Sequence, residues 1–113
     1  MNPFPEPKTR QLLDEISAGY GAGGLSEFQV ARLQREAKAM MVKLPAEAHM
    51  VLGALAGERH DVDEMHSHHT TSIALRQNEP DMRSNYAVSL ARLGLLQEAI
   101  DVYAKFRRWS PKI

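Results

Sequence analysis

Apolar residues recur every three or four positions along most of this chain, which is the spacing that places them on one face of an α-helix. A first helix is predicted over residues 8–18, where this face carries Leu12, Leu13 and Ile16. The glycines of the stretch "GYGAGG" (residues 19–24) end this helix. The three prolines within residues 1–7 predict an extended segment before it.

The pattern predicts a second helix over residues 27–42, for which Ser26 is a favourable N-cap residue. The apolar face of this helix carries Val30, Leu33, Ala37, Met40 and Met41. Pro45 closes the segment, so residues 8–45 are expected to form an N-terminal helical hairpin.

After Pro45 the chain repeats itself. Residues 46–79 align with residues 80–113 without a gap, and small or apolar residues recur at most of the same positions. We call the displacement that moves residue 46 onto residue 80 the repeat shift. It matches Leu52 with Tyr86, Gly53 with Ala87, Met65 with Ala99, and His69 with Tyr103. Helices that cross closely need small residues where they approach, so Gly53 and Ala87 are each expected to meet the second helix of their own unit.

The period and pattern resemble the tetratricopeptide repeat, a helix–turn–helix unit of the same length with the pattern W-x2-L-G-x2-Y, A-x3-F and P. In the second copy, "GLLQEAIDVY" (residues 94–103) is similar to the turn and second helix of that family. In the first copy, "AEAHMVLG" (residues 46–53) is similar to its first helix, whereas Met65 departs from the pattern. The resemblance implies one all-α domain over residues 1–113, with five to six helices stacked in a short right-handed solenoid.

Applying the repeat shift once more, toward the N-terminus, extends the comparison. It places Ala31 at the position of Met65, and Gly19 at the position of Gly53. Residues 12–45 are therefore predicted to be a third, degenerate unit whose first helix is cut short by the glycines.

In the family that this repeat resembles, the first helices of the units line a concave groove that binds peptides or helices. By that resemblance the groove positions are Met50, Val51, Ala54, Ser84, Asn85, Val88 and Arg92. Most of them are apolar or small, so the expected ligand is an apolar peptide or an amphipathic helix of a protein partner. The alternative is that some of these residues pack against the first 45 residues.

The stretch "AKFRRWSPKI" combines aromatic and basic side chains. The residues expected at the edge where a further unit would stack are Tyr103, Phe106, Arg107 and Trp109. This edge is predicted to be covered by a second copy of the chain or by a partner. The runner-up hypothesis is a nucleic-acid-associated regulator, in which the aromatic rings stack on bases and phosphates contact Lys105, Arg107, Arg108 and Lys112.

Three of the five histidines lie close together, at positions 66, 68 and 69. A metal site would recruit His60, His66 and His69, but neither Glu-x-x-His nor His-x3-His is present. The repeat register instead places His69 in a packing position between helices, and His49 in the usual aromatic position of the first helix. Imidazoles in a packing layer lose stability when they are protonated near pH 6, so this layer is predicted to be sensitive to pH.

Composition narrows the function further. Lys+Arg and Asp+Glu are both 14, so the formal net charge is zero and gives no overall attraction to nucleic acid or to an anionic membrane. The chain has no cysteine, which excludes disulfides and thiolate sites. No apolar run is long enough to span a membrane and the first residues do not resemble a signal peptide, so a cytoplasmic location is expected.

Catalysis and cofactor binding have little support in the sequence. Gly19, Gly21 and Gly24 match G-x-G-x-x-G, but a dinucleotide site needs a strand before the glycines, where this chain is predicted to be helical. No nucleophile–base pair is evident from spacing. We therefore predict a non-enzymatic protein–protein interaction module without a cofactor, acting as an adaptor, a chaperone or an inhibitor.

Overall fold

The structure is a computed structural model that describes residues 4–109, with side chains through residue 104. Within that part of the chain all regular structure is helical, so the all-α prediction is confirmed. The six helices are α1 (Pro7–Gly21), α2 (Glu27–Ala39), α3 (Pro45–Glu58), α4 (Val62–Leu75), α5 (Pro80–Arg92) and α6 (Leu96–Trp109).

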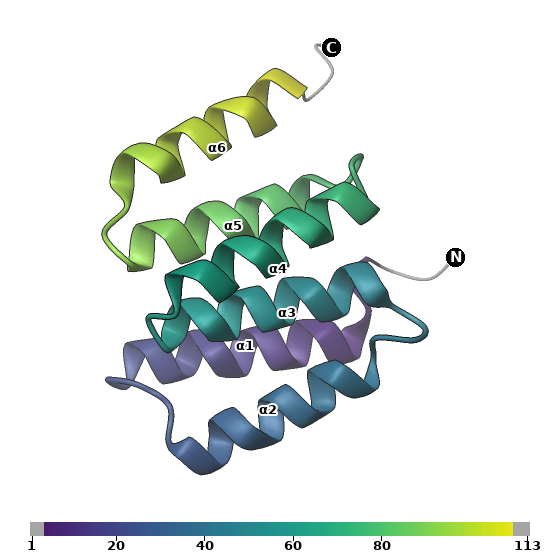
Figure 1. Cartoon of the computed structure of the whole chain (residues 1–113), viewed down its shortest axis with the longest axis vertical. Coiled ribbons are helices and arrows are strands. Elements are labelled where there is room, and N and C mark those ends of the chain that lie inside the picture. The colour runs from purple at the N-terminus through teal and green to yellow at the C-terminus, as the bar shows by residue number, and fades with distance from the viewer. Residues whose placement is uncertain (1–3, 110–113) are drawn as a thin grey trace.

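The helices are arranged as stacked layers around α3 (Figure 1). Two tight hairpins, α3–α4 and α5–α6, follow one another, and α5 packs on both α3 and α4. On its other side α3 contacts α1 and α2, which touch each other only slightly. Helix α6 lies at the end of the stack and packs on α5, and its Glu98 carboxylate lies 3.8 Å from Nε2 of His66 on α4.

The repeat appears in the turns as well as in the helices. The repeat shift moves the bounds of α4 onto those of α6. Both hairpin turns have a residue with left-handed backbone, His60 with φ of 60° and Gly94 with φ of 82°. The next amide closes each turn, donating from Asp61 to the Ala56 carbonyl and from Leu95 to the Leu90 carbonyl, at 2.9 Å in both. His60 therefore occupies a turn position at which glycine is the less strained residue.

The N-terminal hairpin does not keep this register. Ala31, expected at the position of the buried Met65, is exposed, and α2 instead buries Leu33 and Ala37. The glycine-rich loop is the physical reason, because Gly19 makes room for Leu25 of that loop rather than for a second helix. Residues 8–45 thus form two helices that each pack on α3, and the predicted register for them is wrong.

Ion pairs join α1 to α2 in addition to the core cluster that the two helices share. Glu36 of α2 accepts from Lys8 of α1 and from Arg32 of its own helix, the latter at 2.6 Å. Arg32 also pairs with Glu15 of α1. All four side chains are partly exposed, so this network orients the two helices and adds only modestly to stability.

Close packing between α3 and α4 depends on Gly53. A Cβ atom at this position would lie 2.7 Å from Cδ2 of the His69 ring on α4. The ring has no free space to move into, because it is fully buried and stacks on Tyr86 of α5 with 5.2 Å between ring centroids. Gly53 therefore meets the second helix of its own unit, as the repeat predicts.

We expect Gly53→Ala to lower the free energy of unfolding by about 1–2 kcal/mol, measured by urea denaturation. Crowding in a packed core costs about 1–3 kcal/mol, which outweighs the gain of about 1 kcal/mol from replacing glycine in a helix. Gly21→Ala is the matched control, because a Cβ at Gly21 would have nothing within 4 Å. That variant is expected to be as stable as the natural chain or slightly more so.

Candidate functional site

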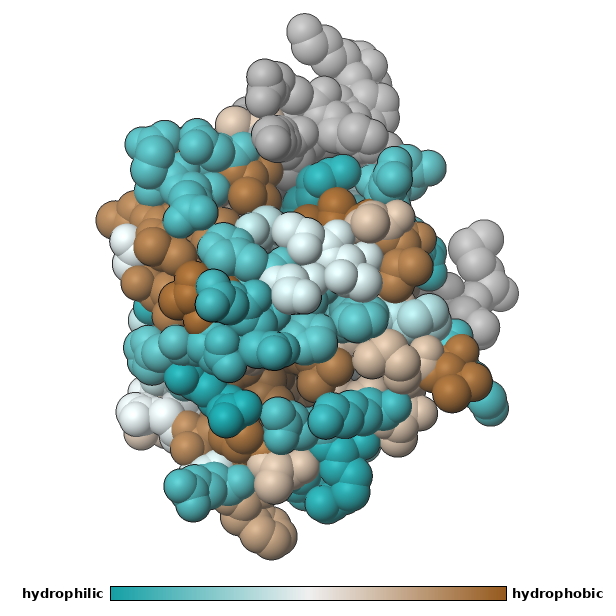
Figure 2. Space-filling view, viewed as in Figure 1, coloured by the Kyte–Doolittle hydropathy of each residue, from teal (hydrophilic) through white to brown (hydrophobic). Residues whose placement is uncertain are grey.

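An open apolar groove of about 540 Å³ runs between α5 and α6. The residues that line it are Ser84, Ala87, Val88, Ala91, Leu96, Ala99, Ile100, Tyr103 and Ala104. Figure 2 shows hydrophobic residues gathered where α5 ends and α6 begins, at the left of the view. Four large side chains of this groove are well exposed, namely Val88 (43%), Leu96 (61%), Ile100 (60%) and Tyr103 (47%). Because exposed apolar patches are typical of surfaces that contact other molecules, this groove is the candidate functional site.

The first repeat unit has a surface equivalent to this groove. The repeat shift maps it onto the surface of the α3–α4 hairpin, where Met50, Gly57, His66 and His69 take the places of Ser84, Ala91, Ile100 and Tyr103. Helix α5 covers these four residues. Val62, the equivalent of Leu96, remains 39% exposed, and Ala54, the equivalent of Val88, packs on the core that α3 shares with α1 and α2. We call the surface of the α3–α4 hairpin under α5 the first seat and the α5–α6 groove the second seat.

Apolar, aromatic and polar contacts hold α5 in the first seat. Met82 packs against Met50 in one core cluster. The Tyr86 ring stacks on His69, and its hydroxyl shares a hydrogen bond of 2.5 Å with Nδ1 of His66. Ser89 lies over Gly57, and its hydroxyl is 2.9 Å from Nε2 of His69.

Only part of the predicted groove takes part in this surface. Ser84 and Val88 line the second seat together with Tyr103, which was predicted at the C-terminal edge. The prediction of an exposed groove at Met50 and Val51 is wrong, since both are fully buried. Met50 lies under α5, whereas Val51 belongs to the core shared by α3 with α1 and α2.

The other three predicted groove residues lie outside the second seat. Ala54 is half-buried against the same core as Val51. Asn85 donates to the Asp81 carbonyl of its own helix at 2.9 Å. Arg92 donates to the Ser17 hydroxyl at 3.3 Å, and its guanidinium lies 4.6 Å from the centre of the Tyr20 ring. Ala54 and Arg92, but not Asn85, therefore support the alternative that the first 45 residues occupy part of the expected groove.

Sequence reasoning missed Leu96 and Ile100, the two most exposed apolar residues of the second seat. The signal was present, because Leu96, Ile100 and Tyr103 follow the i, i+4, i+7 spacing of one helix face. The side chains of Phe106, Arg107 and Trp109 lie outside the described residues, as does the basic tail considered for nucleic acid.

The candidate metal ligands do not converge. His60 lies in the α3–α4 turn, His66 contacts Tyr86, and His69 contacts Ser89. Among the residues that the structure describes, no group of three or more histidine, aspartate or glutamate side chains could hold a metal ion. His66 and His69 instead form a polar layer between α4 and α5.

His49 and His68 extend this polar layer to α3. Their Nδ1 atoms lie 3.0 Å apart, so one ring donates a hydrogen bond and the other accepts it. Nε2 of His68 lies 3.1 Å from a carboxylate oxygen of Glu64. Burial, with the nearby charge of His68, lowers the pKa of His49.

Burial has its largest electrostatic effect at His69. The pKa of this imidazole is lowered to about 3, mainly by burial and to a smaller extent by the electrostatic influence of His68 and His66. The groups that face it are His66 and His68 on α4, and Tyr86 and Ser89 on α5. Because the unfolded chain binds a proton near pH 6.5 and the folded chain does not, stability falls as pH drops below about 6.5.

We expect the free energy of unfolding to fall by about 2 kcal/mol between pH 8 and pH 5 through His69 alone. His69→Gln keeps an amide that can donate toward Ser89 but does not titrate, so it should remove most of this slope. Urea denaturation across the pH range measures the slope for each variant. His60→Asn is the control, since it removes an exposed imidazole from the turn and should leave the slope unchanged. A natural chain with equal stability at pH 8 and pH 5 would contradict this account of the layer.

No helix in the described part of the chain has the length and apolar character needed to cross a membrane. Comparison with protein-family models, curated proteins and solved structures finds no match to this chain. The functional interpretation therefore rests on the residues and their geometry.

Proposed function

We propose that this protein is a non-enzymatic protein-interaction module whose second seat binds one amphipathic helix of a partner. The observation that carries the proposal is the equivalence of the two seats, because the first is already filled by a helix of this chain. The resemblance to tetratricopeptide repeats agrees with it, since stacking of one helix on the preceding hairpin is how such arrays bury their surface. Adaptor, chaperone and inhibitor roles all fit a module of this kind.

The chemistry of the second seat describes the partner helix. Where the first seat offers imidazoles to Tyr86 and Ser89, the second offers Ile100 and Tyr103. A helix with a hydroxyl facing Ile100 would bury a polar group without a partner, which costs about 1–3 kcal/mol. The preferred helix is therefore apolar at the position equivalent to Tyr86 and small at the position equivalent to Ser89, which would lie over Ala91.

A peptide derived from this chain tests the proposal directly. The probe spans residues 79–93, carries Tyr86→Leu and Ser89→Ala, and has a fluorescent label for anisotropy measurements. We expect it to bind more tightly than the unaltered peptide, because its changed face matches the second seat.

Variants of the protein locate the binding surface. Ile100→Glu and Val88→Glu each place a charge in the apolar groove, and each is expected to raise the dissociation constant at least tenfold, about 1.4 kcal/mol. Val42→Glu is the matched control, because Val42 is 91% exposed and does not line the groove. Equal binding by Ile100→Glu and the natural chain would refute the proposal. A concentration-dependent dimer that Ile100→Glu dissociates would assign the groove to a second copy of the chain instead.

A further inference from the structure

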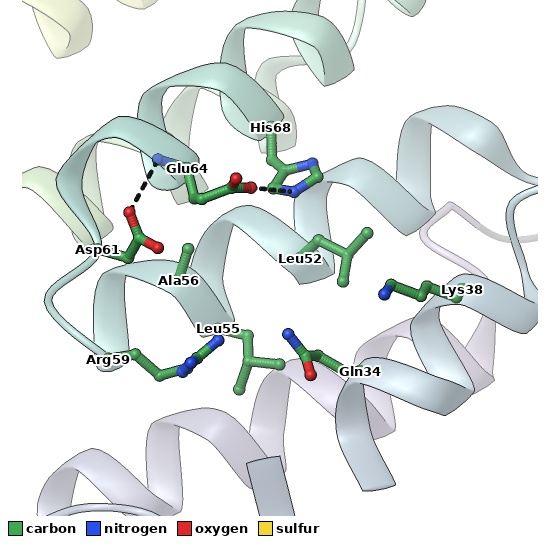
Figure 3. Close-up of a pocket in the computed structure, with 9 residues that line it drawn as sticks. All are labelled: Gln34, Lys38, Leu52, Leu55, Ala56, Arg59, Asp61, Glu64 and His68. Carbon is green, nitrogen blue, oxygen red and sulfur yellow. Dashed lines mark hydrogen bonds and ion pairs between the residues drawn. The ribbon is translucent and has the colours of Figure 1, made fainter. Parts of the chain in front are cut away.

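A second cavity, of about 270 Å³, lies away from the groove, between α2 and the α3–α4 hairpin (Figure 3). Nine residues line it, namely Gln34, Lys38, Leu52, Leu55, Ala56, Arg59, Asp61, Glu64 and His68. The cavity exists because α2 packs on α3 without reaching α4.

The repeat shows that this cavity is specific to the first unit. The repeat shift maps Ala56, Arg59, Asp61 and His68 onto Leu90, Leu93, Leu95 and Val102. Those four apolar residues belong to one packed core cluster with Tyr86. One alanine and three polar residues thus replace the side chains that fill the equivalent space in the second unit.

The walls of the cavity differ in charge. Gln34 and Lys38 approach from α2 and Arg59 from the end of α3, and all three point nitrogen atoms toward the open space (Figure 3). The facing acids are already engaged, since Asp61 accepts from the Glu64 amide at 3.2 Å and Glu64 lies 3.1 Å from His68. The floor between the walls is apolar and consists of Leu52, Leu55 and Ala56.

The two cations that line the cavity, Lys38 and Arg59, are not paired with carboxylates of the described residues. Neither Lys38 nor Arg59 has a side-chain hydrogen bond or ion pair with any described residue. Two other cations on or beside α2, Lys8 and Arg32, are paired with carboxylates, whereas Arg35 of α2 is unpaired among the described residues but does not line the cavity. The guanidinium, the ammonium and the amide can donate hydrogen bonds to an oxyanion. The apolar floor beside them can contact a short apolar group attached to that oxyanion.

We propose that this cavity binds a small organic anion, with its carboxylate or phosphate on Arg59, Lys38 and Gln34 and its apolar part on Leu52 and Leu55. The volume is below that of a typical drug-sized site, which limits the ligand to a small molecule. The proposal is independent of helix binding in the second seat, because the two sites share no residue.

Nuclear magnetic resonance titration of the ¹⁵N-labelled full chain tests the site, with butyrate and inorganic phosphate as probes. Sodium chloride at matched ionic strength is the reference. We expect saturable shifts of the Gln34 side-chain amide and the Arg59 Nε–H. Saturation by butyrate but not by phosphate would assign the site to carboxylates, and the reverse would assign it to phosphates. Shifts from both probes no larger than those from chloride would overturn the proposal.

Substitutions that copy the second unit sharpen the test. Arg59→Leu is expected to weaken probe binding at least tenfold while preserving the melting temperature, because Arg59 is exposed. Ala56→Leu fills the cavity as Leu90 fills its equivalent, and should abolish binding in a folded protein. Lys38→Gln provides a second surface variant if Ala56→Leu fails to fold. Arg35→Leu is the control, since Arg35 is exposed on α2 outside the cavity. Equal loss of binding in Arg35→Leu and Arg59→Leu would show that binding is nonspecific and overturn the proposal.

Discussion

The fold depends on the burial of α3 by four other helices. Ten of its 14 residues are buried, so this helix has no solvent face of ordinary width. Such burial requires small residues where neighbours approach, and Gly53 and Gly57 supply them toward His69 and Ser89. Glu47, the one buried acid of α3, accepts from the Glu6 amide at 2.8 Å and so ties the N-terminal segment to the central helix.

The two repeat units have the same helical hairpin backbone but different side chains on their surfaces. In the first unit the seat for the next helix is a histidine layer, whereas the cavity beside α2 is polar and open. In the second unit the seat is apolar and open, whereas the space equivalent to the cavity is filled by leucines and valine. Each unit thus keeps one surface for packing within the chain and leaves another open, through different side chains and different neighbouring helices.

Much of the architecture could be predicted from periodicity. Helix spacing, the capping by Ser26 and the sequence repeat predicted the helices, and the close approach at Gly53 followed from the repeat. The burial of Val51 could not be predicted, because it depends on how α1 and α2 dock across a glycine-rich loop whose geometry has no periodic signal. The spacing of Leu96, Ile100 and Tyr103 predicts a shared helix face. Interpreting that face as a seat for a helix required the structure, in which α5 covers the equivalent residues of the first unit.

The cavity beside α2 was less accessible to sequence reasoning. Comparing Ala56 with Leu90 and Arg59 with Leu93 reveals a loss of apolar volume in the first unit. A neighbour that repacks can close such a gap, so the open space also requires the position of α2, which contacts α3 but not α4. The histidine layer shows the same limit, because the strong effect of burial on His69 depends on the rings and hydroxyls of α5 around it.

The place of α6 at the end of the stack has a consequence for cooperativity. Helices α1 to α5 are joined through shared contacts with α3, so local opening of any one of them exposes core that the others need. Within the described residues helix α6 packs on α5 and has a side-chain contact to α4, between Glu98 and His66, which makes it the natural unit of subglobal opening. A helix bound in the groove would contact both α5 and α6 and would therefore slow amide hydrogen exchange in α6 more than elsewhere. Binding in the groove would then be detectable as a change in the backbone dynamics of α6, without any change in the rest of the fold.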